Sequence, residues 1–274
     1  MRHFHSIIAY MWCLLVVTSC EDNYRDIVFF SGEEPIYDAG TCTNLTSGAL
    51  LYTIGPKTIF LGIDGGDGEY TVTNNSNEAS VYAEVVDKSN GYARLRLTQK
   101  TIGEAVITVK DGSGMHAVLN ASVSEYKHVW PISKVGIVIK GTVTPAQKTD
   151  IEEAFKDTYP VGTGGRYELY PATWSDPLEK GRLLIYPNDA AVAPLIGMYE
   201  QKKAIDMGGK EVVGYHFAYN NKEYLYFIRS GVPLMTRDVM PSSVDMVEDV
   251  TGVCPIALPQ GVTVYRVQQI KFAY

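Results

Sequence analysis

The sequence predicts a mainly β protein: an N-terminal β-sandwich, followed by a C-terminal domain that is α+β or mainly β with one clear helix. Two observations indicate this class. Short apolar stretches alternate with period two and are separated by Gly, Asn and Asp turns at spacings of about 8–12 residues, as two-sheet sandwiches require. Helical periodicity is convincing in one segment alone. The 274 residues, 46% hydrophobic and 20% charged, suffice for two modest domains.

Residues 1–19 have the pattern of an export signal. A short, weakly basic start precedes an apolar run from Ile7 to Val17, and this run is about half as long as a membrane-spanning helix requires. The next residues, Val17-Thr18-Ser19-Cys20, resemble the lipobox of bacterial lipoproteins. The resemblance implies that Cys20 is acylated and becomes the first residue of the mature protein. A plain secretory signal and a retained membrane anchor remain the alternatives.

Residues 20–49 are expected to form a lipidated tether. Glu21 and Asp22 resemble the acidic stretch that sends many lipoproteins of the Bacteroidetes group to the cell surface. The resemblance implies an outer-membrane lipoprotein, either periplasmic or surface-exposed, with its acyl chains as the membrane contact. The tether contains one apolar patch, residues 27–30, and no helical period.

Two cysteines remain once Cys13 leaves with the leader and Cys20 takes the lipid. In an oxidising compartment Cys42 and Cys254 have one possible pairing, so we predict a disulfide between them. The alternative is two free buried thiols.

Residues 50–125 are expected to form the sandwich. Period-two segments lie at residues 58–63, 69–73, 79–85, 93–98, 103–109 and 116–123. The stretches 68–72, 102–114 and 117–123 resemble bacterial immunoglobulin-like domains of surface adhesins and envelope lipoproteins. The resemblance implies the fold and brings no catalytic motif with it.

Residues 126–274 have a different pattern, in which strand signals are joined by one helix signal, and we recognise no family resemblance in them. Thr144 is placed as a helix N-cap, with Pro145 at the first helical position, Gln147 three residues after the cap and Pro160 as the terminator. Strand patterns return at residues 166–170, 182–186, 212–219, 222–228 and 262–274. Asn220 and Asn221 are predicted to form a tight turn, because Asn tolerates positive φ.

The chemistry of the sequence favours binding over catalysis. The net charge of −7, without clusters of Lys and Arg, argues against nucleic acid as a partner. Asp64, Asp67 and Glu69 offer oxygen ligands for Ca²⁺, but their spacing does not match an EF-hand loop and a plain glycine turn explains them. We assign no catalytic residue, no metal and no cofactor.

Aromatic residues crowd the C-terminal domain. Flat rings with polar handles suit sugar stacking and protein interfaces, and they equally suit an ordinary sheet core. The ligand-binding candidates are Trp130, Trp174, Tyr215, Tyr219, Tyr224 and Tyr226.

The expected function is that of a non-catalytic, envelope-anchored lipoprotein that binds a glycan, a peptide or a partner protein. Two alternatives stay open. One is a divergent envelope hydrolase with an accessory immunoglobulin-like domain. The other is a structural subunit of a surface appendage or transport complex, in which the C-terminal strand exchanges with a neighbour.

Overall fold

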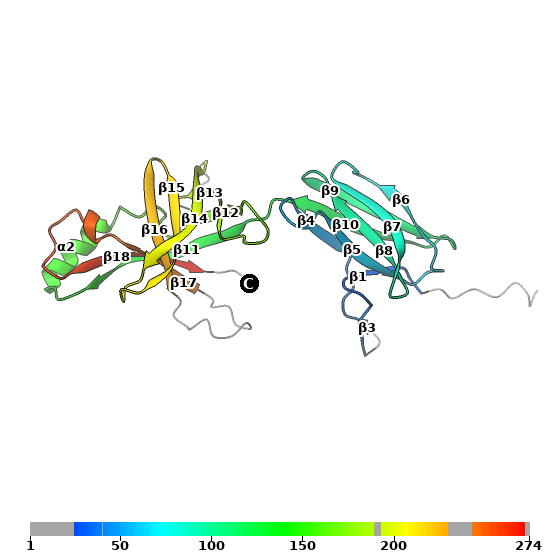
Figure 1. Ribbon diagram of the computed structural model, residues 1–274, viewed down its shortest axis with the longest axis horizontal. Coiled ribbons are helices and arrows are strands. Elements are labelled where there is room, and N and C mark those ends of the chain that lie inside the picture. The colour runs from blue at the N-terminus through cyan, green and yellow to red at the C-terminus, as the bar shows by residue number, and fades with distance from the viewer. Residues whose placement is uncertain (1–24, 40, 189–192, 230–242, 272–274) are drawn as a thin grey trace, which may run out of the picture. The chain divides into compact units, whose positions relative to one another are not determined.

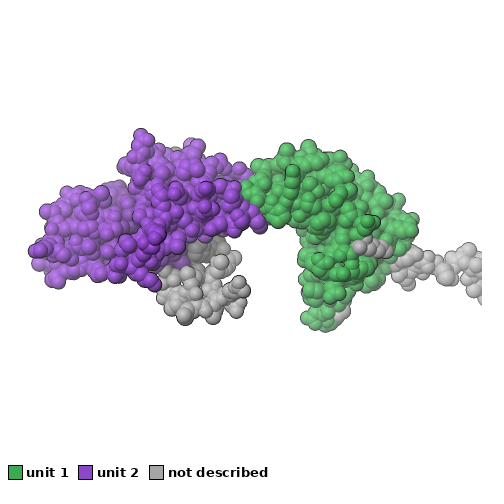
Figure 2. All heavy atoms as spheres, viewed as in Figure 1, with its two compact units in different colours: residues 1–124 green, residues 125–274 purple. Residues whose placement is uncertain are grey.

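The computed structural model describes residues 25–39, 41–188, 193–229 and 243–271. The chain divides into two compact units, residues 1–124 and 125–274, each with its own sheets (Figure 1; Figure 2). Among the described residues the regular structure is almost entirely β, with one α-helix and one short 3-10 helix. The predicted fold class is therefore confirmed. The division after Ser124 lies one residue before the expected boundary.

The first unit is a sandwich of two sheets with the orders β1-β5-β8-β7 and β4-β10-β9-β6. The first sheet consists of β1 (Val28–Phe30), β5 (Thr58–Asp64), β8 (Tyr92–Gln99) and β7 (Val81–Ser89). The second consists of β4 (Gly48–Tyr52), β10 (His116–Ser124), β9 (Gly103–Asp111) and β6 (Tyr70–Asn75). These orders correspond to the A-B-E-D and C-F-G sheets of an immunoglobulin domain, with β4 added parallel to β10.

Alternation along the strands supplies the sandwich core. In β9 the side chains of Ala105, Ile107 and Val109 are buried, and the residues between them face outward. The same alternation in β8 and β10 gives both sheets an apolar inner face. The period-two pattern read from the sequence therefore corresponds to real strands.

The segment expected to be a tether belongs to the sandwich from residue 25 onward. β1 pairs antiparallel with β5, and Ile27 and Phe29 are buried in the core. The hairpin of β2 (Tyr37–Asp38) and β3 (Thr41–Cys42) follows, and β4 begins before residue 50. The expectation of a tether through residue 49 is wrong for these residues, because the apolar patch completes a sheet edge by pairing with residues 62–64.

The second unit is a closed barrel of eight antiparallel strands, each paired with the next in sequence. The strands are β11 (His128–Lys140), β12 (Arg166–Pro171), β13 (Lys180–Tyr186), β14 (Leu195–Ile205), β15 (Glu211–Tyr219), β16 (Lys222–Arg229), β17 (Ser243–Asp249) and β18 (Thr263–Lys271). β11 bends at a register shift between Ile132 and Lys134, so its first part pairs with β12 and its second part with β18. β18 is paired on both sides and is not a free edge for strand exchange.

The helix α2 (Pro145–Phe155) begins as predicted. Thr144 accepts a hydrogen bond from the Gln147 amide, and the Gln147 side chain accepts one from the Thr144 amide, which is a complete capping box. Ile151 and Phe155 are buried against the chain around Val250 and Val264. The helix ends at Phe155, before Pro160, and after an exposed turn at residues 156–158 the chain reaches Val161, which is buried in the barrel core.

The turn between β15 and β16 also forms as predicted. Asn220 and Asn221 have φ values of 50° and 56°, so both occupy the left-handed region that a two-residue hairpin turn requires.

Candidate functional site

Four of the six predicted ligand-binding aromatics lie inside the barrel. Trp130, Tyr215, Tyr219 and Tyr226 are buried in its apolar core. Tyr224 is partly buried and stacks between two of them, with ring centroids 5.0 Å from Tyr219 and 6.2 Å from Tyr226. These five residues therefore pack the core and form no open ligand surface.

Trp174 differs from the other five. It lies between β12 and β13, is 42% exposed, and contacts the ring of Tyr126 edge-on at 5.2 Å. Because Trp174 lies in a connection and not in a strand, the period-two pattern carried no information about its exposure.

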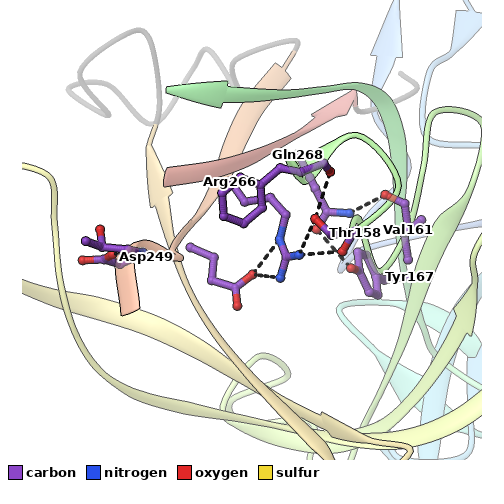
Figure 3. A network of polar contacts seen from close by, with 9 residues as sticks. Thr158, Val161, Tyr167, Asp249, Arg266 and Gln268 are labelled. Atoms are coloured by element: carbon purple, nitrogen blue, oxygen red, sulfur yellow. Dashed lines mark hydrogen bonds and ion pairs between the residues drawn. The ribbon is translucent and has the colours of Figure 1, made fainter. Parts of the chain in front are cut away.

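A buried ion pair lies at the inward side of β17 and β18. The Arg266 guanidinium donates from Nε and Nη2 to Oε2 of Glu248 at 3.0 and 2.6 Å, and from Nη1 to the Thr158 carbonyl at 2.6 Å (Figure 3). Burial raises the pKa of Glu248, and the charge of Arg266 opposes that shift. The pair connects the chain between α2 and β12 to the last strand.

Gln268, two residues after Arg266 and on the same face of β18, extends this network. Its Nε2 donates to the Val161 carbonyl at 2.5 Å, and its Oε1 accepts from the Tyr167 hydroxyl at 3.1 Å (Figure 3). All three residues have no exposed surface. The network is a packed polar part of the barrel core, in which the segment 158–161 is hydrogen-bonded to β18.

The outward side of β12 to β14 carries a different set of side chains. Because Tyr167, Leu169, Leu183 and Ile185 point into the core, the residues between them point outward. We call this set the barrel outer face; it consists of Arg166, Glu168, Tyr170, Arg182, Leu184, Tyr186, Ile196 and Met198. The register aligns Tyr170 with Arg182 and Met198 in one row, and Glu168 with Leu184 and Ile196 in the next.

Glu168 is the buried centre of the barrel outer face, with 4% of its surface exposed. Its carboxylate accepts hydrogen bonds from Nζ of Lys127 at 2.8 Å, Nε of Arg166 at 2.9 Å and the Tyr170 hydroxyl at 2.9 Å. Burial alone would raise the pKa of Glu168, but these hydrogen bonds and the charge of Lys127 outweigh it and hold the pKa below its ordinary value.

Two arginine–tyrosine stacks flank this carboxylate. The Arg166 guanidinium carbon lies 3.7 Å from the Tyr186 ring centroid, and that of Arg182 lies 4.4 Å from the Tyr170 ring centroid. Beside them Ile196 and Met198, on β14, are 69% and 59% exposed.

Sequence reasoning missed the barrel outer face. A signal for it existed in the matching patterns Arg-x-Glu-x-Tyr at 166–170 and Arg-x-Leu-x-Tyr at 182–186. The strand β14, which contributes the exposed Ile196 and Met198, was not predicted at all.

The cysteine prediction differs from the structure. Cys20 lies outside the described residues. Cys42 and Cys254 are both free, partly buried thiols, so the predicted disulfide is not formed. Each thiol has local contacts in its own unit: Sγ of Cys42 lies 3.1 Å from Oδ1 of Asn44, and Cys254 packs near α2.

In the described ranges, no group of three or more His, Cys, Asp or Glu side chains is placed to hold a metal ion. No helix in the same ranges has the length and apolar character that crossing a membrane requires.

Comparison with known proteins adds little. No protein-family model and no curated protein match the chain. Among solved structures it is similar to one described as the structure of the S-layer protein SbsC, domains 5-6, with 13% identity and a TM-score of 0.25. The match covers 81% of this chain and 80% of that one.

Proposed function

We propose that the protein is a non-catalytic lipoprotein of the cell envelope that binds a partner through the barrel outer face. The notion of an envelope lipoprotein rests on the lipobox-like sequence before Cys20. The notion of binding rests on one observation: stacked arginine–tyrosine pairs lie next to exposed apolar side chains on a continuous sheet surface.

The composition of the barrel outer face favours a protein or peptide over a glycan. Arg, Tyr and Met are enriched at protein interfaces, and Tyr and Arg are frequent among residues whose truncation weakens binding most. Sugars would need open tyrosine faces, whereas Tyr170 and Tyr186 already have guanidinium groups over their rings. Ile196 and Met198 supply aliphatic surface that suits a peptide or protein better than a polyol.

A binding screen with a matched pair of variants tests this proposal. The purified mature chain is screened against arrays of glycans, peptides and envelope proteins, and each hit is measured again with Ile196→Asp and with Ile205→Asp. Both isoleucines lie on β14 and are well exposed, but Ile205 lies outside the barrel outer face. We expect a peptide or protein ligand whose affinity falls about tenfold or more with Ile196→Asp and is unchanged with Ile205→Asp.

Two results would contradict the proposal. One is equal affinity of the two variants for every ligand found. The other is turnover of array members by the purified protein, which would favour the hydrolase alternative.

The membrane anchor is tested separately. In cells that produce the full chain, the wild type is expected in the membrane fraction with acyl chains on Cys20, and Cys20→Ala is expected to lose both the acylation and the membrane fractionation. An unmodified amino terminus in the mass spectrum of the wild type would refute the anchor.

A further inference from the structure

A second surface, in the first unit, is hollowed and polar. A cavity of about 350 Å³ lies at one end of the sandwich, where the turn after β5, the turn between β7 and β8, and residue 25 meet. The residues that matter for its chemistry are Arg25, Asp64, Asp67, Tyr70 and Tyr92. Gly65 and Gly66 lie between the two carboxylates, and Gly68 follows Asp67. We call it the sandwich cleft.

The turn that forms the cleft wall is held in place from the neighbouring strand. The carboxylate of Asp111, on β9, accepts hydrogen bonds from the amide of Asp67 at 3.0 Å, the Ser113 hydroxyl at 2.8 Å and the Met115 amide at 2.8 Å. Asp111 is 5% exposed. A loop fixed in this way loses little conformational freedom when a ligand binds.

Glycine is required where this turn meets the chain before β1. Gly65 has a φ of +88°, and a Cβ at that position would lie 2.1 Å from the Asp26 carbonyl oxygen. The Gly66 amide donates to the Arg25 carbonyl at 2.7 Å, which fastens residue 25 beside the turn.

The side chains that line the cleft include both hydrogen-bond acceptors and hydrogen-bond donors. Oδ1 of Asp67 accepts from the Glu69 amide at 2.9 Å, whereas Oδ2 takes no hydrogen bond from any described residue. Asp64 accepts from the Tyr37 hydroxyl at 2.9 Å and lies 3.4 Å from the Arg25 guanidinium, whose side chain is 70% exposed. Tyr70 and Tyr92 contribute half-buried rings.

We propose that the sandwich cleft binds one sugar residue of a glycan. Carboxylates accept hydrogen bonds from sugar hydroxyls, a guanidinium donates to sugar oxygens, and a tyrosine ring covers the C–H face of a pyranose. The cavity volume lies at the small end of the range for ligand sites, so it suits a single ring. A calcium ion, which takes six to eight oxygen ligands, fits less well, because no three acidic side chains among the described residues are placed to hold a metal ion. The proposal is independent of the barrel outer face.

Amide NMR on the full mature chain tests the sugar site. The probes are N-acetylglucosamine, galactose, mannose and glucuronic acid, added one at a time, and calcium chloride added alone. We expect at least one sugar to shift the signals of Gly65, Gly66 and Gly68 in a saturable manner. We also expect the affinity to fall roughly tenfold with Asp67→Asn, which keeps Oδ1 for the turn, and to fall with the exposed Arg25→Ala.

The control is Asp150→Asn, the same change of charge on the exposed side of α2, which should bind sugar like the wild type. The proposal fails if no sugar moves the three glycine signals. It also fails if both cleft variants bind as tightly as the control, or if calcium chloride moves these signals and the sugars do not.

Discussion

Glu168 illustrates how a single residue links stability to the barrel outer face. A carboxylate buried in a protein is tolerated when its charge is paired and its lone pairs accept hydrogen bonds. Lys127, Arg166 and Tyr170 meet that need, and each is itself partly exposed. The same arrangement aligns Arg166 under the Tyr186 ring and Tyr170 under Arg182, so loss of the carboxylate should disturb both stacks.

Glu168→Gln is expected to lower the free energy of unfolding by roughly 1–3 kcal/mol, because three hydrogen-bond donors lose a charged acceptor. The folded pKa of Glu168 is held below the ordinary 4.5, so its contribution is fully present above about pH 4.5 and is lost as the pH falls through the folded value. The difference between wild type and variant in urea unfolding should therefore shrink in acid.

The control for this measurement is Glu200→Gln, at an exposed site on β14, which should change stability by less than about 0.5 kcal/mol. A Glu168→Gln variant that unfolds like the wild type at neutral pH, or a difference that grows in acid, would contradict the role assigned to the carboxylate.

At the scale of elements, α2 shows which parts of a helix depend on local sequence and which depend on tertiary contacts. Its start is set locally, since the capping box satisfies amides that the first turn leaves open. After its end, tertiary contacts hold the chain: the carbonyls of Thr158 and Val161, on either side of Pro160, accept hydrogen bonds from Arg266 and Gln268 of β18.

Thr144→Ala is expected to cost about 0.5–2 kcal/mol, because the Gln147 amide loses its acceptor. Thr149→Ala, an exposed change inside the same helix, should be neutral or slightly stabilising, since Ala is the better helix former. Thermal unfolding followed by circular dichroism distinguishes the two. Equal melting temperatures for both variants would show that the cap is not needed for α2.

At the scale of the whole molecule, each unit has its own apolar core. The sandwich core is made of residues between 27 and 123, and the clusters of the barrel unit are made of residues between 130 and 270. A core that draws on one unit alone is what allows a domain to fold independently.

We therefore expect residues 20–124 and 125–274, produced as separate chains, each to fold and unfold cooperatively. Dispersed NMR spectra and melting temperatures close to those of the corresponding transitions in the full chain would support this expectation. A fragment that is unfolded by itself and becomes ordered when the other is added would contradict it.

Much of the sandwich was predictable from the sequence, because the period-two pattern and the turn residues that mark its strands lie within short stretches of the chain. The alternation of Ala105, Ile107 and Val109 and the turn glycines placed β5 to β10 within a few residues of their observed bounds. β1 could not be recognised, since three apolar residues have no period and become a strand only by pairing with residues 62–64.

The barrel and its surfaces were harder to predict from the sequence. Closure depends on β11 pairing with β18, more than a hundred residues away, and on a register shift near Ile132 that no local pattern encodes. The aromatic-rich composition pointed to ligand binding, yet Tyr215 and Tyr226 lie in the core, while the aliphatic Ile196 and Met198 lie outside. Which of these side chains are buried depends on which face of the sheet turns inward when the barrel closes.

The sequence by itself determined the mainly β class, the start of α2 and the Asn220-Asn221 turn, because these depend on side chains within a few residues of one another. Only the tertiary structure decided that the second sheet closes into a barrel, which face of each strand is buried, and that Cys42 and Cys254 are free thiols. These outcomes depend on contacts between distant segments, whose free energies arise from packing and pairing that no short stretch of sequence contains.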